Sequence, residues 1–190
     1  MNMSAESFLR DYLSDYSSLI RDNMDVVSDL IRIHNSIMEA QNEGHKIIIC
    51  GNGGSAAMAS HVSVDLTKNG DVRCINFNEA DLITCFANDY GFKHWVEKAV
   101  EFYGDEGDVF IAISSSGSSD NMLNGCKAAR KNKFSAVITF SGFNADNPLR
   151  QLGDINMWVD SKAYNFVENI HQVWLLAIVD LIIGTREYPA

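Results

Sequence analysis

The stretch Ile47-Ile48-Ile49-Cys50-Gly51-Asn52-Gly53-Gly54-Ser55-Ala56-Ala57 decides the fold of this 190-residue chain. Its apolar beginning has the length of a buried parallel strand, its glycines predict a tight turn, and its alanine-rich end has helical spacing. A helix that begins there presents unpaired backbone N–H groups and the positive end of its dipole. Glycines let a ligand approach the backbone closely, and phosphate is the ligand that such a turn favours.

A second stretch repeats this arrangement. Asp108-Val109-Phe110-Ile111-Ala112-Ile113 reads as another apolar strand, and it leads directly into Ser114-Ser115-Ser116-Gly117-Ser118-Ser119. Hydroxyls around one glycine offer many small hydrogen-bond donors, and open parallel sheets bind ligands at the carboxyl ends of their strands. We therefore expect the two turns to lie beside each other and to bind a single phosphoryl group.

Strands alternate with helices along the rest of the chain. Further strands are expected over residues 73–77, 135–140 and 155–159, and helices over residues 55–66, 80–86, 93–102, 118–131 and 164–183. Such alternation predicts an α/β fold in which a five-stranded parallel sheet is covered by helices on both faces. Because only two prolines occur and no linker divides the sequence, residues 1–190 are expected to form one domain.

Amphipathic helical spacing covers residues 4–43, with a plausible break at Asp22-Asn23. We expect residues 1–45 to form a helical extension that mediates oligomerisation through its apolar stripe. The alternative is that the same stripe packs as an ordinary helical layer within the chain.

The composition limits the kinds of partner. Acidic residues outnumber basic ones by 25 to 15, which disfavours nucleic-acid and anionic-membrane surfaces but permits a small phosphorylated ligand. The apolar stretch Val173–Ile183 is short for a membrane span and contains Asp180. The cysteines lack metal or redox spacing, and no signal pattern opens the chain, so we expect a reducing, cytoplasmic location.

A dinucleotide-binding fingerprint is the weaker interpretation of the first turn. Gly51, Gly53 and Ala56 satisfy its loose pattern, and Glu79 is a late candidate for the acid that binds a ribose. This interpretation leaves the serine turn unexplained. The first turn also lacks the lysine–serine pair of a P-loop, so hydrolysis of nucleoside triphosphates is not expected.

The two turns, together with Ala87-Asn88-Asp89-Tyr90-Gly91-Phe92, resemble the sugar isomerase (SIS) domain family and particularly its phosphoheptose isomerase group. The order and spacing of these motifs extend the resemblance over nearly the whole chain. The resemblance implies a flavodoxin-like three-layer sandwich, a homotetramer, and pockets at subunit interfaces that hold a sugar phosphate.

The resemblance also implies roles for individual residues. The glycine turn would contribute Gly53 and Gly54, Asn52 and Ser115 would touch the sugar, and Asp89 would line the pocket. Asp89 and Asn88 could instead simply cap or turn the chain. The residues implied to hold phosphate are Ser55, Ser114, Ser116 and Ser119.

Catalytic positions of the group are only partly retained. His61 and Asp65 stand where phosphoheptose isomerases carry a histidine and a glutamate four apart on one helical face. Glu168 and Leu176 stand where the last helix of the group carries a glutamine and a histidine. Leu176 can neither bind a metal nor pass a proton, so a zinc site would retain only His61, Asp65 and Glu168. The sequence therefore assigns no cofactor with certainty, and zinc is doubtful because of Leu176. A plain helical ion pair is the alternative for His61 and Asp65.

The expected activity is a cytoplasmic aldose–ketose isomerisation of a phosphosugar, of the phosphoheptose type. Such a reaction needs a base that moves a proton between C1 and C2 through an enediolate. Glu168 or Asp65 would be the base, with His61 or His171 as the partner acid. His171 could equally be a structural residue packed beside Trp174. A second hypothesis is a scaffold that binds a sugar phosphate or a protein and has lost the chemistry.

Overall fold

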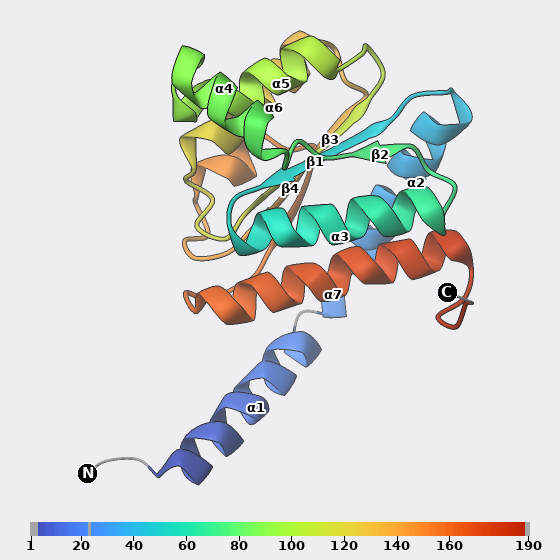
Figure 1. The fold of residues 1–190 in the computed structure, drawn as a ribbon. Coiled ribbons are helices and arrows are strands. Elements are labelled where there is room, and N and C mark those ends of the chain that lie inside the picture. The colour runs from blue at the N-terminus through green and yellow to red at the C-terminus, as the bar shows by residue number, and fades with distance from the viewer. Residues whose placement is uncertain (1–3, 23, 189–190) are drawn as a thin grey trace.

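The computed structural model describes residues 4–22 and 24–188 and contains the predicted five-stranded parallel sheet (Figure 1). The strands lie in the order β2-β1-β3-β4-β5, and all neighbours pair in parallel. Their bounds are Ile47–Gly51 for β1, Cys74–Ile75 for β2, Val109–Ser114 for β3, Ala136–Ser141 for β4 and Ile155–Trp158 for β5. The chain leaves β1 for β2 on one side and returns to β3 on the other, so the strand order reverses between β1 and β3. Such a switch point opens a crevice at the carboxyl ends of the strands.

Helices cover both faces of the sheet because alternate strand residues point to opposite sides. Ile47 and Ile49 belong to one buried cluster, whereas Ile48 and Cys50 belong to the other. The first cluster is covered by α2 (Val27–Asn42), α3 (Gly54–Lys68) and α7 (Tyr164–Ile183). The second is covered by α5 (Trp95–Tyr103) and α6 (Asp120–Lys131), with α4 (Ala80–Tyr90) packed outside them. Short 3₁₀ turns are η1 (Met24–Val26), η2 (Phe92–His94) and η3 (Pro148–Gln151).

The N-terminal helix α1 (Ala5–Asp22) projects away from the sheet and has no buried residue (Figure 1). The rings of Tyr12 and Tyr16 lie against Phe166, and Tyr16, Leu19 and Ile20 pack against the first buried cluster. The predicted break falls at the end of α1, although Asn23 itself lies outside the described residues. An oligomerisation role for this region stays a prediction.

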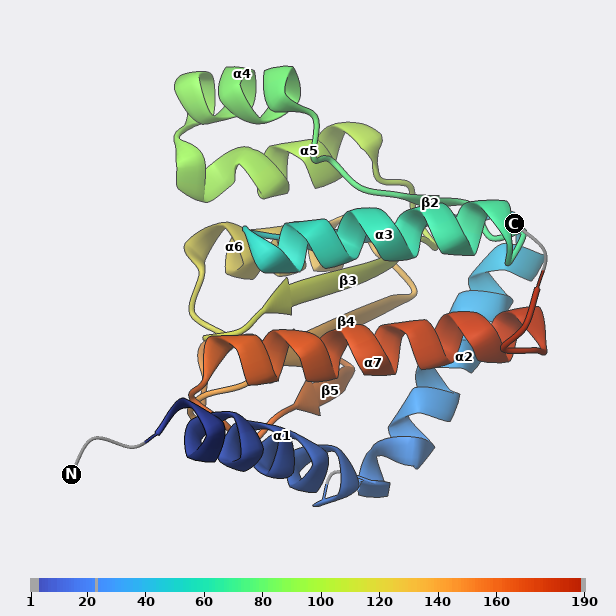
Figure 2. The same cartoon turned by 60° about the horizontal axis from the view of Figure 1, so that its bottom comes forward.

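Helices α3 and α7 lie side by side and run in the same direction (Figure 2). Three contacts establish the register: Gly54 lies at Glu168, His61 at Gln172 and Gly70 at Ile182. The two helices are therefore in contact from the glycine turn to the end of α3.

Helix α7 is 20 residues long and apolar enough, by length and composition, to cross a membrane. The sequence expectation had weighed only its second half, Val173–Ile183. A buried core helix passes the same test, and α7 contributes residues such as Val167, Ile170 and Val179 to the core beneath the sheet. Helix α7 is accordingly a core helix of this fold.

Candidate functional site

The glycine turn and the serine turn meet at the switch point and enclose a cavity of about 120 Å³. This cavity lies at the carboxyl ends of β1 and β3 and opens beside the first turn of α7. The expectation that the two turns lie beside each other is therefore confirmed. The residues that line the cavity are Asn52, Ser55, Ile113, Ser114, Ser115, Ser116, Ser119, Tyr164 and Glu168.

Glycine is required at two positions of the first turn for different reasons. Gly53 has a φ of 55°, a backbone conformation that residues with a Cβ rarely adopt. A Cβ on Gly54 would overlap the carboxylate of Glu168, so this glycine allows α7 to approach the start of α3. The two glycines thus shape the turn and bring Glu168 to the cavity.

A reciprocal amide pair connects the two turns. Asn52 Nδ2 donates to Asn121 Oδ1 over 3.0 Å, and Asn121 Nδ2 donates to Asn52 Oδ1 over 2.8 Å. Asn121 is buried in the first turn of α6, directly after the serine turn. The pair fixes the relative position of both turns and directs part of the Asn52 amide away from the cavity.

The serine turn is held mainly by its own hydrogen bonds. Ser114 Oγ donates to Ser119 Oγ over 3.1 Å, and Ser118 N donates to Ser116 Oγ over 3.3 Å. Ser115 lines the cavity, and its buried hydroxyl has no hydrogen-bond partner among the described residues. Ser118 is exposed but does not line the cavity, whereas Ser116 and Ser119 are half-buried and do line it.

The cavity attracts anions through the backbone more than through side-chain charge. Among the described residues that line it there is no lysine or arginine, and Glu168 is its one carboxylate. Helix α3 begins at Gly54 and α6 begins just beyond Ser119, so both direct the positive ends of their dipoles toward this edge. The arrangement suits a phosphoryl group, whose oxygens accept hydrogen bonds from hydroxyls and backbone N–H groups.

A second polar cluster lies farther along the contact between α3 and α7. His61 Nε2 lies 3.2 Å from Asp65 Oδ2, and His61 Nδ1 lies 3.2 Å from Gln172 Nε2. The His61 side chain is 55% exposed and that of Asp65 is 18% exposed. The structure therefore brings His61 and Asp65 together on one helical face, as the spacing predicts, and adds Gln172 from α7.

Two other predicted residues lie outside the cavity of this chain. His171 is fully buried, and its Nε2 lies 3.0 Å from the carbonyl oxygen of Ser141. Its ring packs against Phe140 and Trp174. His171 therefore has the structural role that was the alternative for it, and its catalytic assignment is corrected. Burial lowers the pKa of His171 from 6.5 to about 4. Asp89 is exposed on α4, where its carboxylate accepts a hydrogen bond from Asn88 Nδ2.

The residues proposed for zinc do not fit a zinc site in this conformation. Zinc sites use at least three histidine, cysteine or carboxylate ligands, and no such group of three gathers in the parts of the chain that the structure describes. Glu168 lies against Gly54 at the serine cavity, whereas Gln172 is the α7 residue beside His61. Leu176, one turn farther along α7, offers no donor atom.

Sequence reasoning missed three residues that the structure brings to these clusters. Tyr164 lines the cavity from the start of α7, Asn121 joins the turns, and Gln172 contacts His61. The spacing of Gln172, four residues after Glu168, is a signal that could have found it, because such residues share a helical face.

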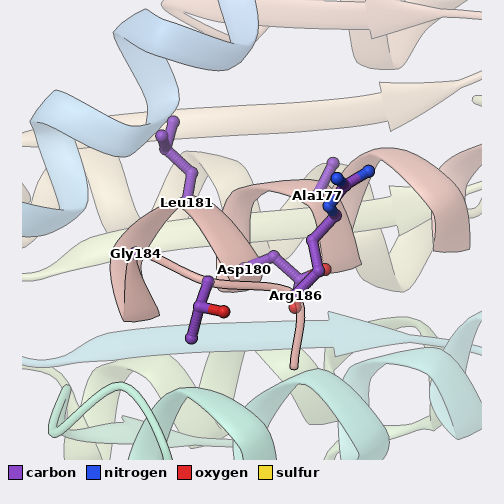
Figure 3. Close-up of a pocket in the computed structure, with 6 residues that line it drawn as sticks. Ala177, Asp180, Leu181, Gly184 and Arg186 are labelled. Carbon is purple, nitrogen blue, oxygen red and sulfur yellow. The ribbon is translucent and has the colours of Figure 1, made fainter. Parts of the chain in front are cut away.

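A larger hollow of about 530 Å³ lies at the other end of α7 (Figure 3). Figure 3 shows its lining around the end of the helix and the segment after it: Ala177, Asp180, Leu181, Gly184, Thr185 and Arg186. It contains neither of the predicted turns nor the His61–Asp65 pair. The smaller cavity therefore remains the candidate site.

Residues 11–142 match the SIS domain family, and the chain belongs to this family. Within it, the chain is similar to phosphoheptose isomerases. It is 35% identical over 144 residues to that of Fusobacterium nucleatum, covering 73% of each chain, and 28% identical over 182 residues to that of Aliarcobacter butzleri, covering 93% and 95%. The structure of phosphoheptose isomerase from Neisseria gonorrhoeae superposes with a TM-score of 0.88 at 26% identity, covering 94% of this chain and 99% of that one.

Proposed function

We propose that this protein is an aldose–ketose isomerase of the phosphoheptose type, which acts on sedoheptulose 7-phosphate. The observation that carries the proposal is the placement of two polar clusters along the contact between α3 and α7, with a phosphate-sized cavity at the start of α3 and the His61–Asp65 pair farther along it. The similarity to phosphoheptose isomerases supports the same reaction class.

The separation of the two clusters suits a seven-carbon sugar phosphate. Helix α3 rises about 9 Å between Ser55 and His61 and about 15 Å between Ser55 and Asp65, at about 1.5 Å per residue. The Asp65 carboxylate comes within the shorter distance because its Oδ2 lies 3.2 Å from His61 Nε2. An extended sugar that carries phosphate on C7 spans about 10 Å from C1 to phosphorus, at about 1.2 Å per bond along the chain. With the phosphate among the serines, C1 and C2 would reach the His61–Asp65 pair, whereas a pentose phosphate would stop about two bonds short.

Asp65 is the base that this placement favours over Glu168. Its carboxylate would take a proton from C1 of the ketose while the C2 carbonyl becomes an enediolate oxygen. Return of that proton to C2, together with transfer of the C1 hydroxyl proton to the enediolate oxygen on C2, leaves the carbonyl at C1 and gives the aldose. His61, in contact with Asp65 Oδ2, would orient the carboxylate, and Glu168 would accept hydrogen bonds from sugar hydroxyls near the phosphate end.

The phosphate would contribute orientation rather than chemistry. Binding energy from this remote group would fix the sugar along α3 and place C1 at the base. Because the cavity lacks basic side chains, we expect affinity to depend on the hydroxyls of Ser55, Ser116 and Ser119 and on the adjacent helix termini.

The homotetramer implied by the family resemblance is part of the proposal, as is a cytoplasmic location. Exposed apolar side chains on α1, including Phe8, Leu9 and Leu13, support burial of this helix against another subunit. Light scattering coupled to gel filtration measures the assembly directly. Four chains per particle is the expected result, and a monomer contradicts this part of the proposal.

A scaffold that retains the fold without chemistry is the second candidate, and Leu176 is the observation that favours it. The deciding experiment is incubation of the purified protein with sedoheptulose 7-phosphate, followed by chromatographic detection of an aldose product. Turnover that disappears in Asp65→Asn supports the isomerase. Binding without turnover, on this and other ketose phosphates, supports the scaffold.

A further inference from the structure

His61 makes two side-chain contacts that come from different helices. Its Nε2 faces the Asp65 carboxylate of α3 at 3.2 Å, and its Nδ1 faces the Gln172 amide of α7 at 3.2 Å. Gln172 is thus the residue through which α7 meets the proposed catalytic pair. Neither the motifs nor the expected catalytic residues include it.

The chemistry of these partners determines where the imidazole proton resides. A carboxylate can only accept a hydrogen bond, so the nitrogen that faces Asp65 must carry a hydrogen. A neutral imidazole has one donor and one acceptor nitrogen, so Nδ1 is then the acceptor. The amide Nε2 of Gln172 is a donor, so it can donate a hydrogen bond to a bare Nδ1 but not to a protonated one. This contact disfavours the opposite tautomer.

We infer that Gln172 is a positioning residue that holds His61 in the Nε2–H tautomer and thereby orients Asp65. This inference deepens the proposed isomerase and rests on it for its catalytic meaning. Because His61 is 55% exposed, water alone would leave its ring free to turn over. The amide ties that ring to the helix that also carries Glu168, four residues earlier on the same face.

The same two contacts oppose metal binding at His61. A protonated Nε2 has no lone pair for a metal, and the Nδ1 lone pair is taken by the amide. Leu176, the next residue along this face of α7, supplies neither a ligand nor a proton. The structure therefore assigns a polar Asp65–His61–Gln172 cluster, made of one ion-pair contact and one hydrogen bond, to the place where a metal site would need free donors.

Nitrogen NMR of the histidine rings tests the tautomer directly. Long-range ¹H–¹⁵N correlation spectra at pH 8, above the ordinary imidazole pKa, distinguish a protonated ring nitrogen from a bare one. His61 is expected to show protonated Nε2 and bare Nδ1. His34 is an internal comparison, because its Nδ1 lies 3.0 Å from Asn35 Oδ1 and should be protonated instead.

Gln172→Leu removes the donor and should give His61 a mixed tautomer signal. Gln172→Glu keeps the size of the side chain but replaces the donor by an acceptor, so protonation should shift toward Nδ1. In turnover assays both variants should lower kcat about tenfold to a hundredfold, with KM changed less than about twofold, since the phosphate contacts are untouched.

Three results would overturn the inference: protonated Nδ1 in the parent protein, an imidazole with both nitrogens protonated at pH 8, or an unchanged His61 signal in both variants. The spectra need no substrate. A failed isomerase assay would therefore count against the proposed function, whereas a wrong tautomer would count against the role of Gln172.

Discussion

His171 should make the protein sensitive to acid, because its imidazole is buried in the neutral form. Burial lowers its pKa from 6.5 to about 4, with the carbonyl of Ser141 opposing that shift only in part. The difference corresponds to about 3 kcal/mol between the protonation states. Since the folded pKa lies below the unfolded one, the unfolded chain binds the proton first as the pH falls. The contribution of the neutral His171 imidazole to the free energy of unfolding is therefore fully present above about pH 6.5. It is lost as the pH falls toward 4.

The magnitude of this loss is measurable. Between pH 7.5 and pH 5, protonation of the unfolded chain at His171 should remove about 2 kcal/mol from the free energy of unfolding. His171→Gln keeps a donor for the Ser141 carbonyl but does not titrate, so its stability should fall by about 2 kcal/mol less over the same range. Urea unfolding at both pH values, at one fixed protein concentration, measures the difference.

A second histidine, His34, which is only half-buried, provides the matched control for this experiment. His34→Gln changes a side chain on the surface of α2 and should leave the pH dependence of stability as it is in the parent. If His171→Gln and the parent protein lose the same stability between the two pH values, His171 is not buried as a neutral imidazole and the reasoning is wrong.

Three further changes test the site. Asp65→Asn should reduce turnover by about a hundredfold or more while phosphate affinity stays constant, as steady-state kinetics and calorimetry would report, because it removes the proposed base; equal loss of both would contradict this role. Asn121→Leu breaks two hydrogen bonds to Asn52 and should cost about 1–3 kcal/mol in urea unfolding and weaken phosphate binding. Asn124→Leu on the same helix is its control, and equal effects would refute the coupling. Exhaustive dialysis against a chelator should leave turnover within about twofold, since no three zinc ligands gather in the described chain; restoration of lost activity by zinc would contradict it.

The sheet and its two turns could be predicted because their signals are local. Apolar runs of strand length that end in glycine or serine give both the strand and its carboxyl end. The last helix was predicted with its observed bounds, Tyr164–Ile183. The expected strand over residues 73–77 was longer than β2, which pairs only at Cys74 and Ile75 on the edge of the sheet, where a single neighbour supports it.

Side-chain direction on α7 could not be predicted from spacing alone. Relative to Glu168, an ideal helix places His171 about 60° to one side and Gln172 about 40° to the other. Both positions are compatible with a shared site by periodicity. The packing of α7 decides between them: His171 enters the core beneath Phe140, and Gln172 faces α3.

Contacts between residues that are far apart in the sequence could not be predicted either. Asn52 and Asn121 are 69 residues apart, and only the switch between β1 and β3 brings their turns together. Tyr164 reaches the cavity because α7 returns across the carboxyl edge of the sheet. Such contacts follow from topology, which the motifs imply only in outline.

The most direct test of the proposed site is a crystal structure of Asp65→Asn with sedoheptulose 7-phosphate, in which the missing base preserves the substrate. The phosphate oxygens are expected within hydrogen-bond reach of Ser55, Ser116 and Ser119, with C1 and C2 beside His61 and the Asp65 carboxylate. A phosphate bound elsewhere, or a sugar whose C1 end points away from His61, would contradict it.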